Sequence, residues 1–580
     1  MAETLISPGV LSRENDISFI QPAPVEAGAA FIGPAVKGPV EEPTLVTSYG
    51  EYQRIFGTTF ESGSAKQEYL TSLAVKSYFA QGGSSALITR VTSGNFTSAT
   101  STAITANGKV DGNGDPVISF QLETLGKGAV LNSAGTVFGD GSLANGTADN
   151  LRWEVSNVNS ADGTFVVTIR RGDDNNKQKA ILETFKVSLD PNSDIYIEKV
   201  IGNQSKSKVS QDGETFIRVS GEHVNRSKYV RVSSVNLPTL NYLATDGVSI
   251  NQDADQDTYT VSLPIAGAGA FENAAGDLVT GGDTYFTNIG NTTQGLAAGD
   301  YTDAIAILEN QDEYVFNIIS APGLIYANSA HRTPIDAIVS LAETRGDCIA
   351  VVDFSNYASS VADVKAEAAN INSSYAASYW PWVQVGSATG KNVFVPAGVV
   401  IPGVYAFTDG ASAPWFAPAG LVRGGIPNVI QTERKLTRTQ RDELYSSNIN
   451  PIATFPGQGI AVFGQKTLQK KSSALDRVNV RRLLIELKKF IGDQSKNLVF
   501  EQNTVATRNK FLAAVNPYLE SVVQRQGLYA YRVVMDDSNN TPDVIDRNQL
   551  IGQIFIQPAK TVEFIVLDFT IEPTGATFNV

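Results

Sequence analysis

The sequence predicts a multidomain protein that combines α/β and α+β regions. Helical and strand patterns alternate in residues 25–93 and 301–430, whereas residues 94–300 carry alternating strands in a polar, turn-rich composition. Residues 431–560 add a helix pair and a few strands. The chain has 580 residues, 42% of them hydrophobic, which is enough for several hydrophobic cores. We therefore expect three folded regions, one of them interrupted by an insertion.

The segments on either side of the polar stretch predict one α/β domain. "YLTSLAVKSYFAQGGSSALITRV", residues 69–91, reads as an amphipathic helix, a Gly-Gly stop and a strand. Later, the strand pattern "EYVFNIISAPGL" is followed by the helical pattern "TPIDAIVSLAETRGD" and the buried strand "CIAVVDF". Such alternation is typical of parallel strands joined by crossover helices. We expect residues 25–93 and 301–430 to form one discontinuous middle domain.

Residues 94–300 differ in composition from both flanking segments. Thr, Ser, Gly, Asn and Asp dominate, and strands such as "TFVVTIRR" and "ETFKVSLDP" alternate in polarity. A polar, turn-rich composition suits a region that projects into solvent. We expect an inserted, β-rich outer region here.

Residues 431–560 predict a domain of helices and a small sheet. In "SALDRVNVRRLLIELKKFI", six apolar side chains fall within an arc of roughly 120° at about 100° per residue; they are Val480, Leu483, Leu484, Leu487, Phe490 and Ile491. A second helical stretch starts at Thr504, restarts at Pro517 behind the cap Asn516, and ends at Gly527. The strand patterns "LYAYRVVMDD" and "LIGQIFIQPA" follow.

Both ends of the chain carry strand patterns that need partners. Residues 561–580, "TVEFIVLDFTIEPTGATFNV", alternate apolar side chains, and leaving five or more of them in water would forgo about 10 kcal/mol. Residues 1–24 form an arm in which prolines bracket short extended pieces. The partner strands lie in this subunit or in a neighbouring one. The candidate side chains for such pairing are Ile17, Phe19, Val562, Phe564, Val566, Leu567 and Phe569.

Charge is distributed unevenly along the chain. The net charge is −14, but residues 431–530 hold sixteen Lys and Arg against eight Asp and Glu, a balance of +8 that leaves −22 for the rest. Such asymmetry marks either a surface for an acidic partner, nucleic acid or protein, or a solvated helix face. The candidate residues of a basic surface are Arg477, Arg481, Lys488, Arg508 and Lys510.

The sequence predicts neither catalysis nor a bound cofactor or metal. His223 and His331 are the only histidines, and Cys348 begins an apolar strand, where a buried thiol is more common than a nucleophile. "GSATGKN" lacks the spacing of a phosphate loop and predicts a hairpin turn, and "DGNGD" lacks the glycine and glutamate of a calcium loop and predicts a turn. Two RGD strings are interpreted as incidental.

The chain shows no pattern for the membrane or for secretion. No segment approaches the roughly 18 consecutive apolar residues of a membrane span, and "MAETLISPGV" lacks the layout of a signal peptide. With Cys348 as the only cysteine, no intrachain disulfide is possible. We expect a protein made in a cytoplasm-like compartment.

Several motifs resemble a known family. "LISPGV", "AAFIGPAVKGPVEEPTLVTSYGEYQRIFG", "APWFAPAG", "INPIATFPGQGIAVFGQKTL" with the helix after it, and "GQIFIQPAKTVEFIVLDF" are similar to contractile tail sheath proteins of bacteriophages. This family is shared with R-type bacteriocins and other contractile injection systems. The resemblance covers most of the chain outside the insertion.

The resemblance implies a structural subunit without enzymatic activity. Sheath subunits form hexameric rings stacked in a helical sheath around a tail tube, and meet baseplate and tail terminator proteins. Residues 431–560 would then face the tube, the arms 1–24 and 561–580 would add strands to neighbours, and the five basic residues would face an acidic tube. Contraction would drive the tube through the host envelope during genome delivery, without direct contact to nucleic acid or insertion into the membrane.

The implied location is the virion tail, assembled in the host bacterial cytoplasm. The alternative is a β-rich, adhesin-like host-binding tail protein. That alternative is favoured by the Thr-, Gly- and Asn-rich insertion and by the RGD strings.

Overall fold

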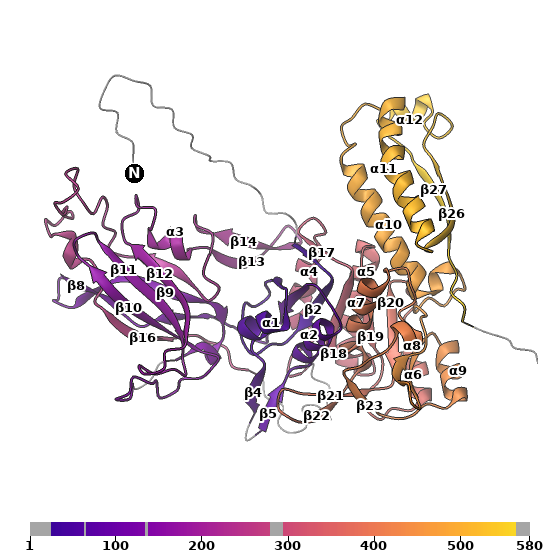
Figure 1. Ribbon diagram of the computed structural model, residues 1–580, viewed down its shortest axis with the longest axis horizontal. Helices are drawn as coiled ribbons and strands as arrows, with labels where there is room; N and C mark the ends of the chain where they lie inside the picture. Colours follow the sequence, from indigo (N-terminus) through magenta and orange to yellow (C-terminus); the bar gives the residue numbers. More distant parts are fainter. Residues whose placement is uncertain (1–24, 63–64, 134–136, 279–293, 564–580) are drawn as a thin grey trace, which may run out of the picture.

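The computed structural model describes residues 25–62, 65–133, 137–278 and 294–563. It consists of three regions along the long axis of the molecule: a β-rich region at one end, a mixed sheet covered by helices in the middle, and a pair of long helices with a small sheet at the other end (Figure 1). The mixed α/β multidomain class predicted from the sequence is confirmed. None of the helices in these four ranges is long and apolar enough to cross a membrane.

The middle region is built on an eight-stranded sheet with the order β25-β24-β20-β19-β18-β2-β6-β3. The five inner pairings are parallel, and the two outermost pairings are antiparallel. Segments that are far apart in sequence thus share one sheet. Its strands are β2 (Ala29–Gly33), β3 (Thr44–Val46), β6 (Ala86–Arg90), β18 (Ile318–Ile325), β19 (Ile349–Asp353), β20 (Ala376–Trp380), β24 (Asn450–Phe455) and β25 (Gly459–Val462).

Both faces of this sheet are buried, so its strands read as continuous apolar runs. Along β19, Ile349 and Val351 face one hydrophobic core, and Ala350 and Val352 face the other. The first core is covered by α1 (Tyr49–Phe56), α2 (Leu70–Ala80), α7 (Ile401–Ala411) and the start of α10 (Val478–Lys496). The second is covered by α4 (Asp300–Ile307), α5 (Ser329–Arg345), α6 (Val361–Ala368) and α9 (Arg438–Ser446).

Local sequence signals explain where these helices begin and end. The Ser48 side chain accepts a hydrogen bond from the Glu51 amide at the start of α1. Ser360 and Thr437 begin α6 and α9 with complete capping boxes. Gly346 ends α5 at a φ of 69°, a left-handed conformation that favours glycine.

Short elements surround the middle region. They are β1 (Val25–Ala27), which pairs with β17 (Tyr314–Phe316); β4 (Thr59–Ser62), which pairs with β5 (Ala65–Glu68); the sheet of β21 (Val383–Gly386), β22 (Asn392–Val395) and β23 (Val429–Thr432); and α8 (Gly420–Arg423).

The β-rich region is a second eight-stranded sheet, antiparallel throughout, around its own core. Its order is β12-β11-β10-β16-β7-β9-β15, and β8 also pairs with β9. A separate hairpin, β13–β14, and a short helix, α3, lie beside it. The elements are β7 (Ser98–Ser101), β8 (Ile104–Val110), β9 (Pro116–Lys127), β10 (Leu151–Asn159), β11 (Thr164–Arg171), β12 (Ile181–Ser188), α3 (Ile197–Ile201), β13 (Ser205–Gln211), β14 (Glu214–Ser220), β15 (Val230–Val235) and β16 (Gly267–Glu272).

Two features attach this region to the middle one. Its two connections lie side by side, because the Thr97 amide donates to the Ala275 carbonyl at 3.1 Å and the Ala275 amide donates to Thr97 Oγ1 at 2.7 Å. The β13 strand returns to the middle region, where Lys206 pairs with Glu42 at 2.5 Å and Lys208 pairs with Glu41 at 2.6 Å.

The C-terminal region is organised around α10 and α11 (Val505–Gln524), which pack on the strands β26 (Leu528–Val534) and β27 (Gln553–Pro558), with α12 (Pro542–Asp546) between them in sequence. The α10 helix belongs to two cores: Val478 and Ile485 pack into the middle region, and Leu483 and Leu487 pack against α11. The expected restart at Pro517 is wrong. The α11 helix continues through Pro517, so tertiary packing overrides the local cost of a proline.

Candidate assembly interface

The β26–β27 hairpin has one covered and one open face. The strands are antiparallel, with Tyr531 opposite Ile556 and Val533 opposite Ile554. These four side chains are partly buried against the core of α10 and α11. Alternate side chains point outward, and Phe555 is 57% exposed. Because side chains alternate between the two faces of the strands, one face of the sheet packs against the helices and the other is exposed to solvent.

The edges of this sheet are also open. Within the four described ranges, β26 and β27 hydrogen bond as strands only to each other. The outer edge of each strand therefore presents backbone groups to which a further strand can pair. A two-stranded sheet is marginal by itself, and additional strands stabilise it.

The chain that follows β27 is attached at two points. The Ala559 amide donates to the Gly527 carbonyl at 3.1 Å, next to the start of β26. Four residues later, the Glu563 carboxylate receives Arg477 Nε at 2.7 Å and Tyr445 Oη at 2.9 Å. Burial alone would raise the pKa of Glu563, but hydrogen bonds, the first from Arg477, outweigh burial and lower it.

A groove of about 890 Å³ lies beside this segment. Trp415 and Phe463 provide apolar walls, Arg441 lies over the Phe463 ring, and Tyr529 and Val562 complete the lining. Tyr529 is 64% exposed and Val562 is 80% exposed. Apolar side chains therefore remain accessible next to the last described residues.

The predicted pairing residues can be placed only in part. Val562 is exposed and lies in irregular structure. The other candidates, Ile17, Phe19, Phe564, Val566, Leu567 and Phe569, lie outside the described residues. At the other end of the chain, Val25 to Ala27 pair in parallel with β17, so the first described residues belong to the middle region.

The five predicted basic residues do not share one exposed strip. Lys488 and Lys510 are exposed, and Arg477 is half-buried in its contact with Glu563. Arg481 is buried, lies 4.0 Å from the Tyr375 ring centroid, and has a pKa that burial lowers. Arg508 is buried and pairs with Asp537 at 2.6 Å. Their role toward a tube stays a prediction.

The residues and motifs considered above as catalytic or metal sites lie in the core or in turns. Cys348 is buried, and burial raises the pKa of its thiol, which disfavours the nucleophilic thiolate. His331 Nδ1 accepts a hydrogen bond from the Ile325 amide at 2.8 Å. The predicted hairpin turn at "GSATGKN" is confirmed by the pairing of Gly386 with Asn392. The predicted turn at "DGNGD" is confirmed as well.

Sequence reasoning did not find the polar cluster of Tyr445, Gln465 and Glu563. They are separated by up to 118 positions, and only the folded chain brings them together. The sole signal in the sequence was a carboxylate at the beginning of an apolar terminal strand pattern.

Comparison with known proteins finds matches to one family over the second half of the chain. Residues 294–468 match the central domain of phage tail sheath proteins, and residues 470–572 match the phage tail sheath C-terminal domain. Two successive parts of the chain thus match two domains of phage tail sheath proteins. The resemblance predicted from the sequence motifs is confirmed.

Relatives carry the same description. The tail sheath protein of Enterobacteria phage T4 is 38% identical over 309 residues, which cover 49% of this chain and 46% of that protein. The tail sheath protein of Vibrio phage KVP40 is 43% identical over 188 residues, 32% of this chain and 28% of that protein. The matched parts thus span less than half of either relative. A crystal structure of a sheath tail protein from Listeria innocua shares the fold, with a TM-score of 0.50 and 11% identity over 92% of this chain and 96% of that one.

Proposed function

We propose that this chain is the subunit of a contractile tail sheath, which polymerises around a rigid tube and contracts to drive that tube through a cell envelope. The observation that carries the proposal is the open β26–β27 sheet beside the point where the C-terminal segment leaves the fold. A terminal strand and a sheet with free edges are complementary, and strand addition joins such parts in many complexes.

The proposed domain roles follow from this arrangement. Residues 1–24 and 561–580 are arms that add strands to neighbouring subunits, and residues 431–560 form the inner domain that faces the tube. Residues 25–93 together with 301–430 form the middle domain, and residues 94–300 form the outer insertion. The β26–β27 sheet of each subunit is the acceptor for arms from its neighbours.

Strand exchange also explains how subunits stay connected while they move. Each arm holds its neighbour through backbone hydrogen bonds, which do not depend on the angle between the folded regions. Rigid-body rotation of subunits about the arms then converts an extended lattice into a shorter and wider one. The driving free energy is stored during assembly, so the subunit needs neither a hydrolytic site nor a bound cofactor. The proposed partners are further copies of the chain, the tail tube, the baseplate and the tail terminator.

Truncation tests the proposal. A chain that ends at Glu563 lacks residues 564–580 but retains every described contact. We expect it to fold, with a melting temperature close to that of the full chain, and to remain monomeric in sedimentation and electron microscopy. Polymers formed by this truncated chain at the concentration that suffices for the full chain would contradict the proposal.

The adhesin-like alternative predicts a different outcome. A host-binding protein is a discrete particle that binds cells through the insertion. The full chain would then show no hollow polymers under any assembly condition and would bind to the bacterial surface. Electron microscopy of the purified full chain distinguishes the two functions.

A further inference from the structure

We propose that Glu563 is the anchor of the C-terminal arm: a positioning residue that fixes where and in which direction the arm leaves the subunit. This inference rests on the proposed function, because it assigns a role in strand exchange to a contact within one chain. It goes beyond that function by naming the group that controls the exchange.

The Glu563 carboxylate has four hydrogen-bond donors around it. Its Oε1 accepts Arg477 Nε at 2.7 Å and Gln465 Nε2 at 3.0 Å. Its Oε2 accepts Arg477 Nη2 at 3.1 Å and Tyr445 Oη at 2.9 Å. An ionised carboxylate has about four acceptor positions, so this one is fully satisfied. A carboxylate on the solvent-exposed surface is satisfied by water and does not require four hydrogen bonds from the protein.

The donors come from three separate segments. Tyr445 belongs to α9, Gln465 follows β25, and Arg477 is the residue that precedes the first turn of α10. These segments belong to the middle sheet region and to the start of the helix that links it to the C-terminal region. Glu563 therefore attaches the arm at the junction between the two regions and not to the β26–β27 hairpin from which the chain comes.

The residues next to Glu563 show that the anchor is local. Val562 is 80% exposed, whereas the Glu563 side chain is only 17% exposed. Thr561 Oγ1 accepts Gln465 Nε2 at 2.5 Å, on the same side as the carboxylate. One polar contact point thus holds residues 561–563, while the Val562 side chain stays accessible.

A fixed starting point matters for an exchanged strand. Binding of an arm to a neighbour loses less conformational entropy when the first residue of the arm is already immobilised. The same constraint sets an effective concentration of the arm near one acceptor sheet and lowers it near others. During contraction the anchor is also the point through which a neighbour pulls on this subunit. Loss of the anchor should therefore weaken assembly and leave the folded subunit unchanged.

The test compares the full chain with Glu563→Gln and Tyr445→Phe, and uses Glu501→Gln as the control. Glu501 is exposed in the connection between α10 and α11, and its substitution by Gln removes the same charge without touching the anchor. The measurements are the melting temperature of the monomer and the critical concentration for polymerisation. We expect the monomers to melt within about 2 °C of the wild type.

We expect the critical concentration to rise about tenfold for Glu563→Gln and about twofold to threefold for Tyr445→Phe, which removes one of four hydrogen bonds. Glu501→Gln should match the wild type. Equal critical concentrations for all four proteins would overturn the anchor. If Glu563→Gln does not fold, Tyr445→Phe decides alone, and an unchanged critical concentration for that variant again overturns it.

The anchor variants and the truncated chain together distinguish a failure of the anchor from a failure of the proposed function. If the chain that ends at Glu563 stays monomeric while the anchor variants assemble normally, strand exchange stands and the anchor fails. If the truncated chain also assembles normally, strand exchange by the C-terminal arm fails as well.

Discussion

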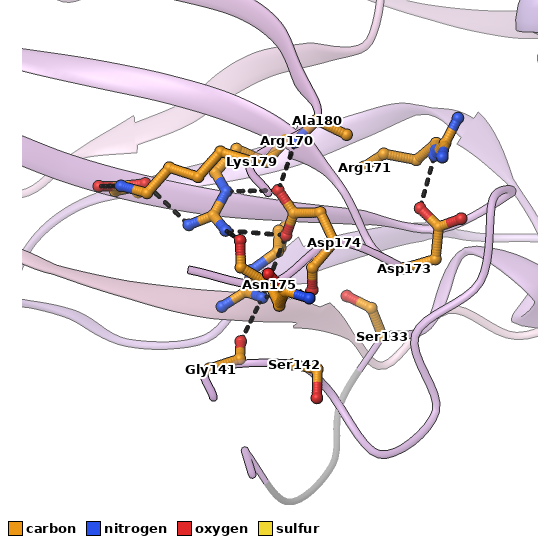
Figure 2. A network of polar contacts seen from close by, with 12 residues as sticks. Ser133, Gly141, Ser142, Arg170, Arg171, Asp173, Asp174, Asn175, Lys179 and Ala180 are labelled. Carbon is orange, nitrogen blue, oxygen red and sulfur yellow. Dashed lines mark hydrogen bonds and ion pairs between the residues drawn. The ribbon is translucent and has the colours of Figure 1, made fainter. Parts of the chain in front are cut away.

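Arg170 and Asp174 form a bidentate ion pair in the insertion, with Nε to Oδ2 at 2.7 Å and Nη2 to Oδ1 at 2.8 Å, and neither side chain is more than 1% exposed (Figure 2). Arg152, which is 2% exposed at its side chain, adds a contact to Asp174 Oδ1 at 3.2 Å. Arg170 also pairs with Glu154 Oε2 at 2.8 Å, so Asp174 is the carboxylate that the two buried guanidinium groups share. A buried ion pair contributes little relative to apolar residues, but loss of one partner is costly.

We expect Asp174→Ala to destabilise the insertion by about 3–5 kcal/mol, because Arg152 would remain buried and charged without its carboxylate, and Arg170 would keep only its pair with Glu154. The matched control is Asp173→Ala. Asp173 pairs with Arg171 at 2.5 Å, but that arginine is 47% exposed, so its loss should cost about 0–1 kcal/mol. Hydrogen exchange of the β10 and β11 amides reports the stability of this region. Equal exchange rates in the two variants would refute the assigned role.

Asp353 at the end of β19 should make stability depend on pH. Burial raises the pKa of Asp353 to about 7, against an opposing hydrogen bond from the Gly398 amide. The unfolded carboxyl titrates near 3.8, so between about pH 4 and 7 the folded state holds a proton that the unfolded state has released. This contribution to stability is complete below that window, falls through it as pH rises, and is lost above it.

We expect Asp353→Asn to remove this slope. Relative to the variant, the wild type should lose on the order of 1 kcal/mol per pH unit across the window, with little further change above pH 7. Urea unfolding at pH 5 and pH 8 measures the difference. Glu309→Gln, a change at an exposed side chain, is the control and should keep the wild-type slope. Parallel behaviour of wild type and Asp353→Asn would exclude Asp353 as the titrating group.

The insertion should be replaceable by a short linker. Thr97 and Ala275 are already hydrogen bonded to each other, so a Gly/Ser linker in place of residues 98–274 has almost no distance to span. The middle region would lose surface ion pairs such as Lys206 with Glu42, which are weak. We expect the shortened chain to fold and to polymerise, as judged by electron microscopy. A folded chain that cannot assemble would make the insertion part of the lattice.

The elements with strong periodicity could be predicted from the sequence. The buried run "CIAVVDF" contains β19, and the apolar positions of α10 pack as expected, with Phe490 stacked on Tyr518 at 3.7 Å between ring centroids. The spacing of apolar residues depends only on which side of a helix or strand faces the core. This spacing can be read from a short stretch of sequence, so it predicts the element.

Contacts between distant residues could not be predicted. Arg481 and Lys488 lie about two turns apart on one helix and were expected to share one basic strip. Both contact Tyr375 of another region, but Arg481 is buried there, whereas Lys488 is exposed and donates from Nζ to Tyr375 Oη at 3.1 Å. Pro517 was expected to interrupt a helix, but the core around Val515 and Leu519 keeps α11 continuous. In each case the deciding partner is remote in sequence, and no periodicity reports it.

The burial of Arg481 and Arg508 changes which residues can hold the proposed tube. Reversal of Arg481 to Glu would place an unpaired carboxylate against Tyr375 in a buried site, so it should destabilise the fold by several kcal/mol. Lys488 and Lys510 are exposed. Reversal of Lys510 should change stability by no more than about 0.5 kcal/mol, and reversal of Lys488, which donates to Tyr375 Oη at 3.1 Å, by about 1 kcal/mol. They are the residues that can test electrostatic retention on an acidic tube.

We expect Lys488→Glu combined with Lys510→Glu to fold normally and to reduce binding to tail tubes, because each reversal turns an attraction into a repulsion that repeats in every subunit along the tube. Raising the salt concentration should weaken the wild type and narrow the difference, since exposed charges are screened. Co-sedimentation with tubes at low and high salt measures both effects. The control is Lys177→Glu, an equal charge change at an exposed residue of the insertion. If the double variant and the control sediment with tubes equally well at low salt, these two lysines do not face the tube.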